Sequence, residues 1–427
     1  MTRIILERAH LIDGAGGTLA DATIIVEGDH ILNVVQGPVE AGSADIVYDL
    51  AGKTVMPGMC IGHFHAEYDG LNSMPGLSLG SERPPGVTMA YAIKNMRIAL
   101  HAGFTSALGT ACVYDTDVCL EMAMAEGVCE GPRIVPCSPH IVATGTHFPA
   151  TPWWLEARNL GLEQGQCTGP DEFRKFIRLQ AQRGVRMMKL LPSGGHGFPH
   201  TRGMRNIGSD ELKAAINAAH ERGAWIRAHV NYKDQILECV ESGIDIIDHA
   251  DDLDEECIEA MVKHGTVYCP TIGMTVMTIR WDETKPHFEF MKYYPKDESY
   301  IENMSIMLLK AQKAGIKMLI GDDYGPYYGF MPDFWGNEIN MFIDEMKFDP
   351  MAVIEIVTAN GAPFFNQETG SIARGKLADL LILNFDPLTD GFSGFADPGA
   401  KIAAVMKGGR FARCDIAQKR LDAMQPH

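Results

Sequence analysis

The sequence predicts an α/β fold in which a (β/α)8 TIM-like barrel is joined to a small β-sandwich domain built from the two ends of the chain. Two observations support this prediction. Eight short apolar runs alternate with helix-period segments through the middle of the chain, and β-rich segments lie at both ends. Runs that are apolar throughout are typical of parallel strands covered on both faces. The predicted boundaries are 1–56 and 367–427 for the β-sandwich and 57–366 for the barrel.

The β-rich ends contain short β-branched runs separated by turn residues such as glycine and aspartate. In the N-terminal part these runs are Ile4–Leu6, Ala22–Glu27 and His30–Val35, and in the C-terminal part they are Ala378–Asn384 and Ile402–Lys407. Each has the composition of a strand. Because the termini of a chain often lie close together, we expect the two ends to meet in one domain.

The middle of the chain reads as eight strands of a parallel sheet. The predicted strands are Gly58–His63, Thr105–Thr110, Arg133–Ser138, Val185–Leu191, Ala224–Val230, Ile244–His249, Thr266–Pro270 and Ile316–Gly321. The clearest helix between them is Ser209–Arg222, with Ser209 as the expected N-cap. Eight such units fit a closed barrel. An open doubly wound sheet is the alternative, but no G-x-G-x-x-G follows the first strand, which disfavours its dinucleotide-binding form.

The composition narrows the class of partner. The chain of 427 residues has 37 basic and 55 acidic side chains, a formal net charge of −18. Nucleic acids and anionic membranes attract cationic surfaces, so neither partner is expected. No apolar run approaches the roughly 20 residues that a membrane span needs. We therefore expect a cytoplasmic protein that acts on a small-molecule substrate. We also expect the protein to form a homo-oligomer, which is the default for soluble barrels.

The ten cysteines form no C-x-x-C pair and have irregular spacings. This pattern is typical of a protein in a reducing compartment, where cysteines serve as small buried apolar residues. They therefore predict neither a disulfide framework nor a cysteine-bound metal.

Polar side chains that can bind metal gather where the predicted strands end. The candidates are His63, His65, His229, His249 and Asp322. Because alternate residues of a strand share a face, both imidazoles of the H-x-H pair should point into the barrel. Each candidate alone has an ordinary structural explanation. Five buried polar groups at one end of a barrel would be costly without partners, and together they predict a metal site.

Lys189 lies in the fourth predicted strand, among methionines and leucines. Burial disfavours the ammonium form and lowers the pKa of a lysine. A neutral amine beside cations can take up carbon dioxide and become a carbamate, which is an anionic oxygen ligand. A Schiff-base lysine and a lysine paired with an acid are the alternatives, and the residue alone does not decide between them.

The order of these motifs resembles the amidohydrolase superfamily nearly end to end. The resemblance is to the binuclear branch with a carboxylated lysine, which includes prolidase-like and imidazolonepropionase-related enzymes. The matching motifs are Met56-Pro57-Gly58 with His63-Phe64-His65, Lys189 with Ser193-Gly194-Gly195, Ala228-His229, Asp248-His249, Gly321-Asp322, and Gly375–Leu380 with Asp386-Pro387.

The resemblance implies a hydrolase that cleaves an amide-type C–N bond by attack of a hydroxide bridging two divalent ions. His63, His65 and Asp322 would hold the buried ion, His229 and His249 the outer ion, and N-carboxylated Lys189 would bridge them. Zn²⁺ is the expected metal, and Mn²⁺ or Co²⁺ could substitute. Asp322 would act as general base and then as general acid.

Three further residues are candidates for polarising the substrate carbonyl. His147 resembles the family's Gly-Gly-His segment, although Thr146 stands where glycine is usual. Tyr232 resembles a tyrosine that the prolidase-like branch keeps after its strand-five histidine, shifted by a residue or two. His140 lies near the end of the third strand. A loop histidine or a tyrosine packed at the barrel rim would explain the first two equally.

Aromatic and methionine-rich loops follow the seventh and eighth predicted strands. They favour a substrate with a hydrophobic or aromatic group, such as an N-acyl amino acid or dipeptide, a carbamate or a urea. A mononuclear deaminase or a cyclic amidine or imide hydrolase of the same superfamily is the alternative enzyme. Deaminases carry a glutamate after strand five, and Val230-Asn231-Tyr232 contains none. A catalytically dead scaffold would be expected to lack ligands.

Overall fold

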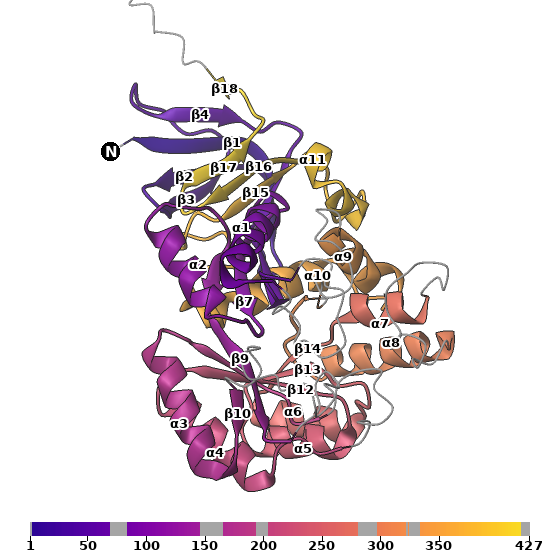
Figure 1. Ribbon diagram of the computed structural model, residues 1–427. Helices are drawn as coiled ribbons and strands as arrows, with labels where there is room; N and C mark the ends of the chain where they lie inside the picture. Colours follow the sequence, from indigo (N-terminus) through magenta and orange to yellow (C-terminus); the bar gives the residue numbers. More distant parts are fainter. Residues whose placement is uncertain are drawn as a thin grey trace, which may run out of the picture.

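The computed structural model describes residues 2–68, 83–145, 165–193, 204–280, 297–321, 323 and 334–419. In these ranges the strands form one sheet of nine strands, one of six and one of three. The nine-stranded sheet lies at one end of the molecule, and the two smaller sheets with most of the helices make up the rest (Figure 1). The predicted α/β class is confirmed.

The nine-stranded sheet combines both ends of the chain. Its strands are β1 (Arg3–Ile12), β2 (Thr18–Glu27), β3 (His30–Gln36), β4 (Ile46–Asp49), β5 (Thr54–Pro57), β15 (Leu380–Leu383), β16 (Ile402–Lys407), β17 (Arg410–Cys414) and β18 (Gln418–Lys419). Strand β5 pairs antiparallel with β15, and β18 pairs antiparallel with β4. The N-terminal and C-terminal strands therefore lie side by side, indigo beside yellow in Figure 1. The β-sandwich architecture and the domain boundaries stay predictions.

Parallel strands form the two smaller sheets. The three-stranded sheet contains β6 (Met59–Phe64), β7 (Phe104–Gly109) and β8 (Arg133–Val135). The six-stranded sheet contains β9 (Cys137–Ala143), β10 (Gln166–Cys167), β11 (Met187–Leu190), β12 (Trp225–Val230), β13 (Ile246–His249) and β14 (Val267–Cys269). The run predicted as one third strand is divided at Pro136, which separates β8 in one sheet from β9 in the other. Proline lacks the amide proton that a continuous ladder requires.

The eighth predicted strand, Ile316–Gly321, is not assigned as a strand, so this detail of the prediction is wrong. Met318 forms only an isolated parallel bridge with Tyr268. The Gly62 amide donates to the Ile320 carbonyl at 2.5 Å on the other side. The segment thus contacts β14 and β6 at single points, which is too little for a continuous ladder.

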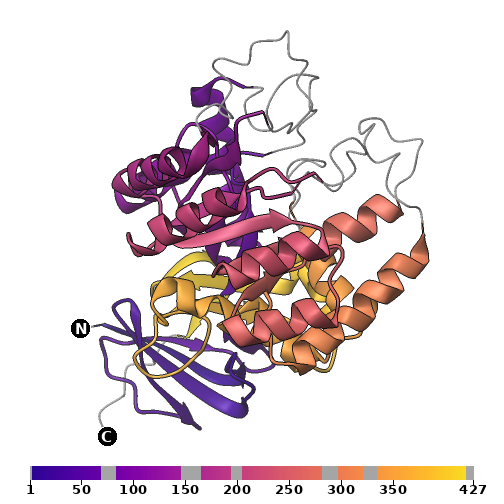
Figure 2. The same ribbon diagram turned by 90° about the horizontal axis from the view of Figure 1, so that it is seen from below.

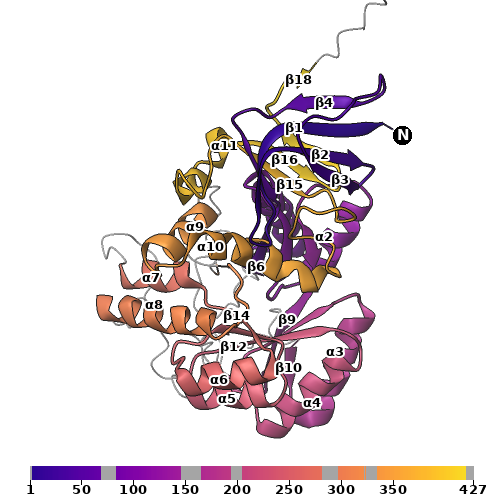
Figure 3. The same ribbon diagram turned by 180° about the vertical axis from the view of Figure 1, so that it is seen from behind.

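Helices follow most of the parallel strands. They are α1 (Pro85–His101), α2 (Thr116–Ala125), α3 (Gly169–Gln182), α4 (Ser209–His220), α5 (Lys233–Glu241), α6 (Glu255–His264), α7 (Ile272–Ile279), α8 (Glu298–Lys313), α9 (Phe334–Asp344), α10 (Pro350–Val357) and α11 (Pro398–Lys401), with 3-10 turns at Ala359–Phe365 and Phe392–Ala396. Helices α3 to α6 lie on the side of the six-stranded sheet that faces away from the nine-stranded sheet (Figures 1 and 3). Among the described residues, no helix is long and apolar enough to cross a membrane.

The prediction that Ser209 caps its helix is wrong by one residue. Gly208 is the N-cap of α4, and its amide donates to the Glu211 carboxylate at 2.8 Å. The same carboxylate accepts the amide of Gly169 at 2.8 Å, at the start of α3. The glutamate side chain therefore satisfies amides at the beginnings of two helices, and a serine cap is not needed.

A single residue, Gly58, joins the nine-stranded sheet to the first parallel strand. Its amide donates to the Asp379 carbonyl at 2.9 Å, next to β15. A Cβ atom built on Gly58 would lie 2.1 Å from the Thr105 hydroxyl oxygen, so β7 leaves room only for glycine here. The N-terminal strands, indigo in Figure 2, lie at one end of the molecule, and their sheet leads directly into β6.

We expect Gly321→Ala to destabilise the fold. A Cβ atom on Gly321 would lie 2.3 Å from the His63 amide nitrogen and 2.6 Å from its Cβ, so the backbone of β6 would have to move. Overpacking of this kind costs about 1–3 kcal/mol. Denaturant unfolding measures the loss. Gly86→Ala is the matched control because a Cβ on this exposed helical residue meets nothing within 4 Å. Equal stability of the two variants would contradict the prediction.

Candidate metal centre

Four histidines from different strands lie together at the carboxyl ends of the parallel strands. His63 is in β6 and His65 just beyond it, while His229 is in β12 and His249 ends β13. The ring centre of His63 lies 5.3 Å from the ring centre of His65 and 5.3 Å from that of His249. The ring centres of His229 and His249 are 4.3 Å apart. All four are buried. The sequence identified these side chains, and the structure brings their imidazoles within reach of one another.

Among the described residues, Asp323 is an acid that contacts both His63 and His65, and the sequence analysis did not consider it. Its carboxylate lies 3.2 Å from Nε2 of His63 and 3.1 Å from Nε2 of His65. Burial alone would raise the pKa of Asp323, but the two histidines outweigh it and hold that pKa well below its usual value. Asp322 and His147 lie outside the described residues, so the roles predicted for them stay predictions.

Hydrogen bonds on the far side of two rings select the nitrogen that faces the cluster. Nδ1 of His65 donates to the Ala111 carbonyl at 2.9 Å. Nδ1 of His249 lies 2.7 Å from the Thr271 hydroxyl, which itself donates to the Pro270 carbonyl at 2.8 Å. In each ring the contact made by Nδ1 leaves Nε2 as the nitrogen available to a metal ion.

A buried ion cluster lies directly behind His63. Arg227 donates through Nε to the Asp248 carboxylate at 3.0 Å and through Nη2 to its other oxygen. The same guanidinium donates to the Gly62 carbonyl at 2.8 Å. Nδ1 of His63 lies 3.3 Å from Asp248. Arg227 and Asp248 are both fully buried, so each is the counter-ion that makes the burial of the other tolerable.

Lys189 belongs to the same cluster. Its Nζ lies 2.5 Å from the Asp248 carboxylate, and its side chain is almost completely buried. Burial lowers the pKa of Lys189 although the neighbouring Asp248 favours the ammonium form. The sequence left three alternatives for Lys189: a carbamate, a Schiff-base lysine and a lysine paired with an acid. This contact corresponds to the last of them. Both Asp248 oxygens are also bound by Arg227, so the carboxylate does not depend on Lys189 for a counter-ion.

The loop after β6 is held so that it supports the ring of His65. The Tyr68 ring stacks on the His65 ring with centres 4.3 Å apart and planes 9° apart. Asn95 of α1 donates to the carbonyls of Ala66 and Tyr68 at 2.9 and 3.0 Å. His65 is thus fixed through one ring face and through Nδ1. The sequence carried no signal for this support, because Asn95 looks like an ordinary helical residue.

Two of the three candidates for polarising a carbonyl lie among the described residues. The His140 ring centre is 6.2 Å from that of His65, and His140 pairs with Lys189 in the register of β9 and β11. Loss of water and the nearby His65 hold the pKa of His140 well below its usual value. Tyr232 is the residue before α5, and its carbonyl accepts the amide of Ile236 at 2.9 Å. The structure thus brings His140 to the histidine cluster.

Glu338 of α9 is a buried acid at the edge of the site that sequence reasoning missed. It is fully buried, and neither carboxyl oxygen has a hydrogen-bond partner of normal geometry among the described residues. Burial raises the pKa of Glu338 to about 8, although the nearby amides of Ile272, Gly273 and Gly321 act in the opposite direction. The side chain is therefore protonated at neutral pH, between the start of α7 and the segment that ends in Asp323.

The donor atoms suit a divalent metal ion. One ligand atom from each of His63, His249 and Asp323 lies within 4.8 Å of the others, so the three could hold one cation. Imidazole nitrogens and carboxylate oxygens are the usual ligands of Zn²⁺, Mn²⁺ and Co²⁺. A second possible group contains His63, Asp248 and Cys269. Burial holds the pKa of the Cys269 thiol well above its usual value, which disfavours the thiolate that a metal needs.

Comparison with known sequences gives a family and a relative that aligns over nearly the whole chain. The profile of the Amidohydrolase family matches residues 54–412. Ochratoxinase of Aspergillus niger is 24% identical over 432 aligned positions, which cover 94% of this chain and 84% of that protein.

Comparison with solved structures shows the fold that this sequence shares. A Xaa-Pro dipeptidase with bound methionine superposes with a TM-score of 0.83 at 23% identity, covering 96% of this chain and 100% of the other. The Aspergillus niger ochratoxinase structure gives 0.82 at 21% identity, with 97% and 96% covered. Phenylurea hydrolase B gives 0.74 at 19% identity, with 96% of each chain covered. At these identities the likeness establishes the fold alone.

We expect Glu338→Gln to flatten the pH dependence of stability. The unfolded chain releases this proton near the usual value of 4.5, and the folded chain keeps it to about pH 8. Because the folded state binds more protons in this window, stability falls as pH rises through it, by at most about 1.4 kcal/mol per pH unit. The glutamine variant lacks this contribution.

Denaturant unfolding of both proteins between pH 5 and 9 measures the difference. Glu302→Gln, at an exposed position of α8, is the control and should keep the original slope. Parallel curves for the Glu338→Gln variant and the unaltered protein would contradict the prediction.

Proposed function

Because the chain belongs to the amidohydrolase family and is a hydrolase that acts on carbon–nitrogen bonds, we propose that it uses two divalent metal ions to cleave an amide-type bond in a small molecule. The observation that carries this proposal is the convergence of His63, His249 and Asp323, whose ligand atoms lie within 4.8 Å of one another. His65 and His229 extend this group through contacts with Asp323 and His249.

We propose Asp323, rather than Asp322, as the acidic ligand from the eighth segment. Among the described residues it is the acid in contact with both His63 and His65, at 3.2 and 3.1 Å. These two histidines and Asp323 would hold one ion, and His229 and His249 would hold the other. Zn²⁺ is the ion that this set favours, with Mn²⁺ and Co²⁺ as substitutes.

Lys189, as a carbamate, would supply an oxygen to each ion. Its burial and lowered pKa favour the neutral amine that reacts with carbon dioxide. The new negative charge would lie beside Asp248, and the two-point contact of Arg227 with Asp248 offsets that charge. The ammonium paired with Asp248 is the competing state of the same side chain.

The residues around the ions divide the chemical work. When bound, divalent ions polarise a carbonyl and lower the pKa of water. Asp323 accepts a proton from the attacking water and delivers it to the leaving nitrogen. His140, kept neutral by its lowered pKa, donates a hydrogen bond to the substrate carbonyl oxygen. Tyr232 and His147 are the other candidates for this last role.

We also infer that the parallel strands close into one (β/α)8 barrel covering residues 57–366. The β14 amide of Tyr268 donates to Lys317 at 3.0 Å, and Gly62 of β6 donates to Ile320 at 2.5 Å. Segment 316–321 thus links the last strand of one sheet to the first strand of the other. Strands β8 and β9, one residue apart, link the sheets at the opposite side. A barrel would direct all the strand ends to one mouth.

The substrate that we propose has a hydrophobic or aromatic group next to the scissile amide, carbamate or urea. Two names among similar proteins, Xaa-Pro dipeptidase and phenylurea hydrolase B, refer to compounds in which nitrogen is bonded to a carbonyl. The aromatic and methionine-rich loops that led to this proposal lie largely outside the described residues. Homo-oligomer formation and the absence of nucleic-acid partners stay predictions from the sequence.

Metal analysis tests the proposal. Protein purified without chelator in bicarbonate buffer should contain two divalent ions per chain. Lys189→Ala and Asp323→Asn should each lose bound metal and lower kcat/KM at least about a hundredfold, because each removes a ligand. Asp322→Asn is the matched control, and it should keep two ions. If Asp322→Asn loses metal and Asp323→Asn does not, the assignment of the acid is reversed.

A substrate panel tests the class of bond. We expect hydrolysis of N-acyl amino acids, dipeptides, carbamates or aryl ureas, and faster turnover where the acyl or amine group is apolar than for a matched polar compound. Product amine measured by chromatography gives the rate. Release of ammonia from an aminated heterocycle, with no cleavage of any panel compound, would favour the deaminase instead.

A further inference from the structure

The end of β13 has an unusual backbone. His249 has φ 72° and the next residue, Ala250, has φ 53°. Two consecutive residues with side chains are therefore in the left-handed region, which normally favours glycine. Such conformations persist only where surrounding contacts hold them, and they are frequent at functional sites. Contacts from β14 and from the residues that follow it hold His249 in this conformation.

One of these contacts comes from Tyr268 in the neighbouring strand β14. Its hydroxyl donates to the His249 carbonyl at 2.7 Å, and the residue is only 2% exposed. In the register of the two strands Tyr268 pairs with Ile247, two residues before His249. The side chain therefore reaches forward along the strand to the left-handed turn.

A second contact comes from Thr271, which follows β14 and also has a left-handed φ of 50°. Its hydroxyl lies 2.7 Å from Nδ1 of His249, within hydrogen-bond distance, and donates to the Pro270 carbonyl at 2.8 Å. Strand β14 and the residues just after it thus hold His249 at two places. Tyr268 holds its backbone, and Thr271 holds its ring.

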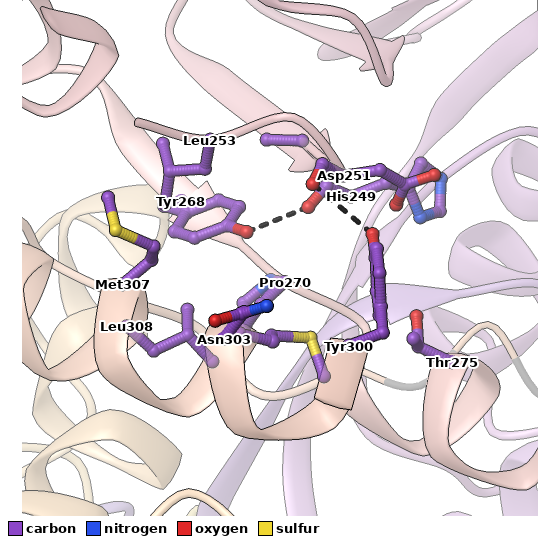
Figure 4. A pocket seen from close by; sticks show the side chains of 12 residues that line it. His249, Asp251, Leu253, Tyr268, Pro270, Thr275, Tyr300, Asn303, Met307 and Leu308 are labelled. Atoms are coloured by element: carbon purple, nitrogen blue, oxygen red, sulfur yellow. Dashed lines mark hydrogen bonds between the residues drawn. The ribbon is translucent and has the colours of Figure 1, made fainter. Parts of the chain in front are cut away.

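A cavity lies beside this arrangement, on the side of β14 that faces α8. It has a volume of about 80 Å³, and the rings of Tyr268 and Tyr300 form part of its wall (Figure 4). Tyr300 donates to the Asp251 carbonyl at 3.2 Å, two residues beyond His249. Because the cavity leaves the loop incompletely packed, we expect the contacts of Tyr268 and Thr271 with His249 to matter more for its conformation than they would in a filled interior.

We propose that Tyr268 and Thr271 are positioning residues that hold His249 in its left-handed conformation and thereby fix the site of one metal ion. Neither touches the metal or the substrate. This inference rests on the proposed function, because it takes His249 as a ligand. It predicts that the affinity of one of the two ions depends on polar groups of β14 and its following loop, which contribute no ligand themselves.

The test is titration of metal-free protein with Zn²⁺ in bicarbonate buffer, with the heat of binding measured by isothermal titration calorimetry. For Tyr268→Phe we expect the Kd of one ion to rise about 10–100-fold, the usual effect of losing support behind a ligand, while the other ion binds as before. Tyr300→Phe is the matched control, since it removes a hydroxyl from the same cavity that donates to the Asp251 carbonyl, two residues beyond His249. Its two Kd values should stay within about threefold of the original.

Thr271 gives an independent pair of variants, which keeps the test decisive if Tyr268→Phe does not fold. Thr271→Val should weaken one ion in the same way, and Thr271→Ser, which restores the hydroxyl, should rescue it. Thermal unfolding of the metal-free proteins separates positioning from stability. A variant that lowers the melting temperature but weakens both ions equally has a purely structural defect and would overturn the inference.

The two proposals fail in different ways. If the unaltered protein binds no divalent ion in bicarbonate, the proposed function fails and this inference fails with it. If the unaltered protein binds two ions and Tyr268→Phe, Thr271→Val and the controls all bind them equally well, the metal centre stands and the positioning role is wrong.

Discussion

The ion pair between Arg227 and Asp248 is the interaction on which the site depends. Both side chains are fully buried, and removing one partner of such a pair typically costs about 3–5 kcal/mol because the other charge is left without compensation. The pair also joins four strands, since Arg227 of β12 binds Asp248 of β13 and the carbonyls of Gly62 in β6 and Gly109 in β7. Lys189 of β11 adds a fifth strand. The strands that carry the histidines are cross-linked by this ion pair, so the ion pair helps to fix the positions of the histidines.

The histidines could be predicted from the sequence because the two-residue period of a strand shows which side chains share a face. His63 and His65 are two residues apart, and strand periodicity alone places both on one face. The α/β class followed equally directly from apolar runs alternating with helices. Arg227 could also have been found in this way, since it precedes His229 by two residues and shares its face. It was missed because a lone arginine in an apolar strand offers no reason to expect a partner.

Asp248 and Asp323 could not be identified from periodicity. Neighbouring residues of a regular strand face opposite sides, so Asp248 and His249 should not both point inward. They do so because the chain turns into the left-handed region at His249, and no glycine marks that turn. The sequence analysis chose Asp322 and did not consider Asp323. Segment 316–321 forms only an isolated bridge with β14, so strand alternation is not a dependable guide to the side chains just beyond it.

The one-residue connection at Gly58 has a consequence for how this protein can change over evolutionary time. The terminal sheet enters β6 with no linker, and β6 delivers His63, so insertions or domain exchanges at this joint would shift a catalytic strand. The loops that follow the strands begin beyond this joint, although Tyr68 and Thr271 within them support His65 and His249. New specificities should therefore arise by changes to loop residues other than these supports, while the joint and the charged base are inherited unchanged, and a mutant library intended to alter selectivity would best be restricted in the same way.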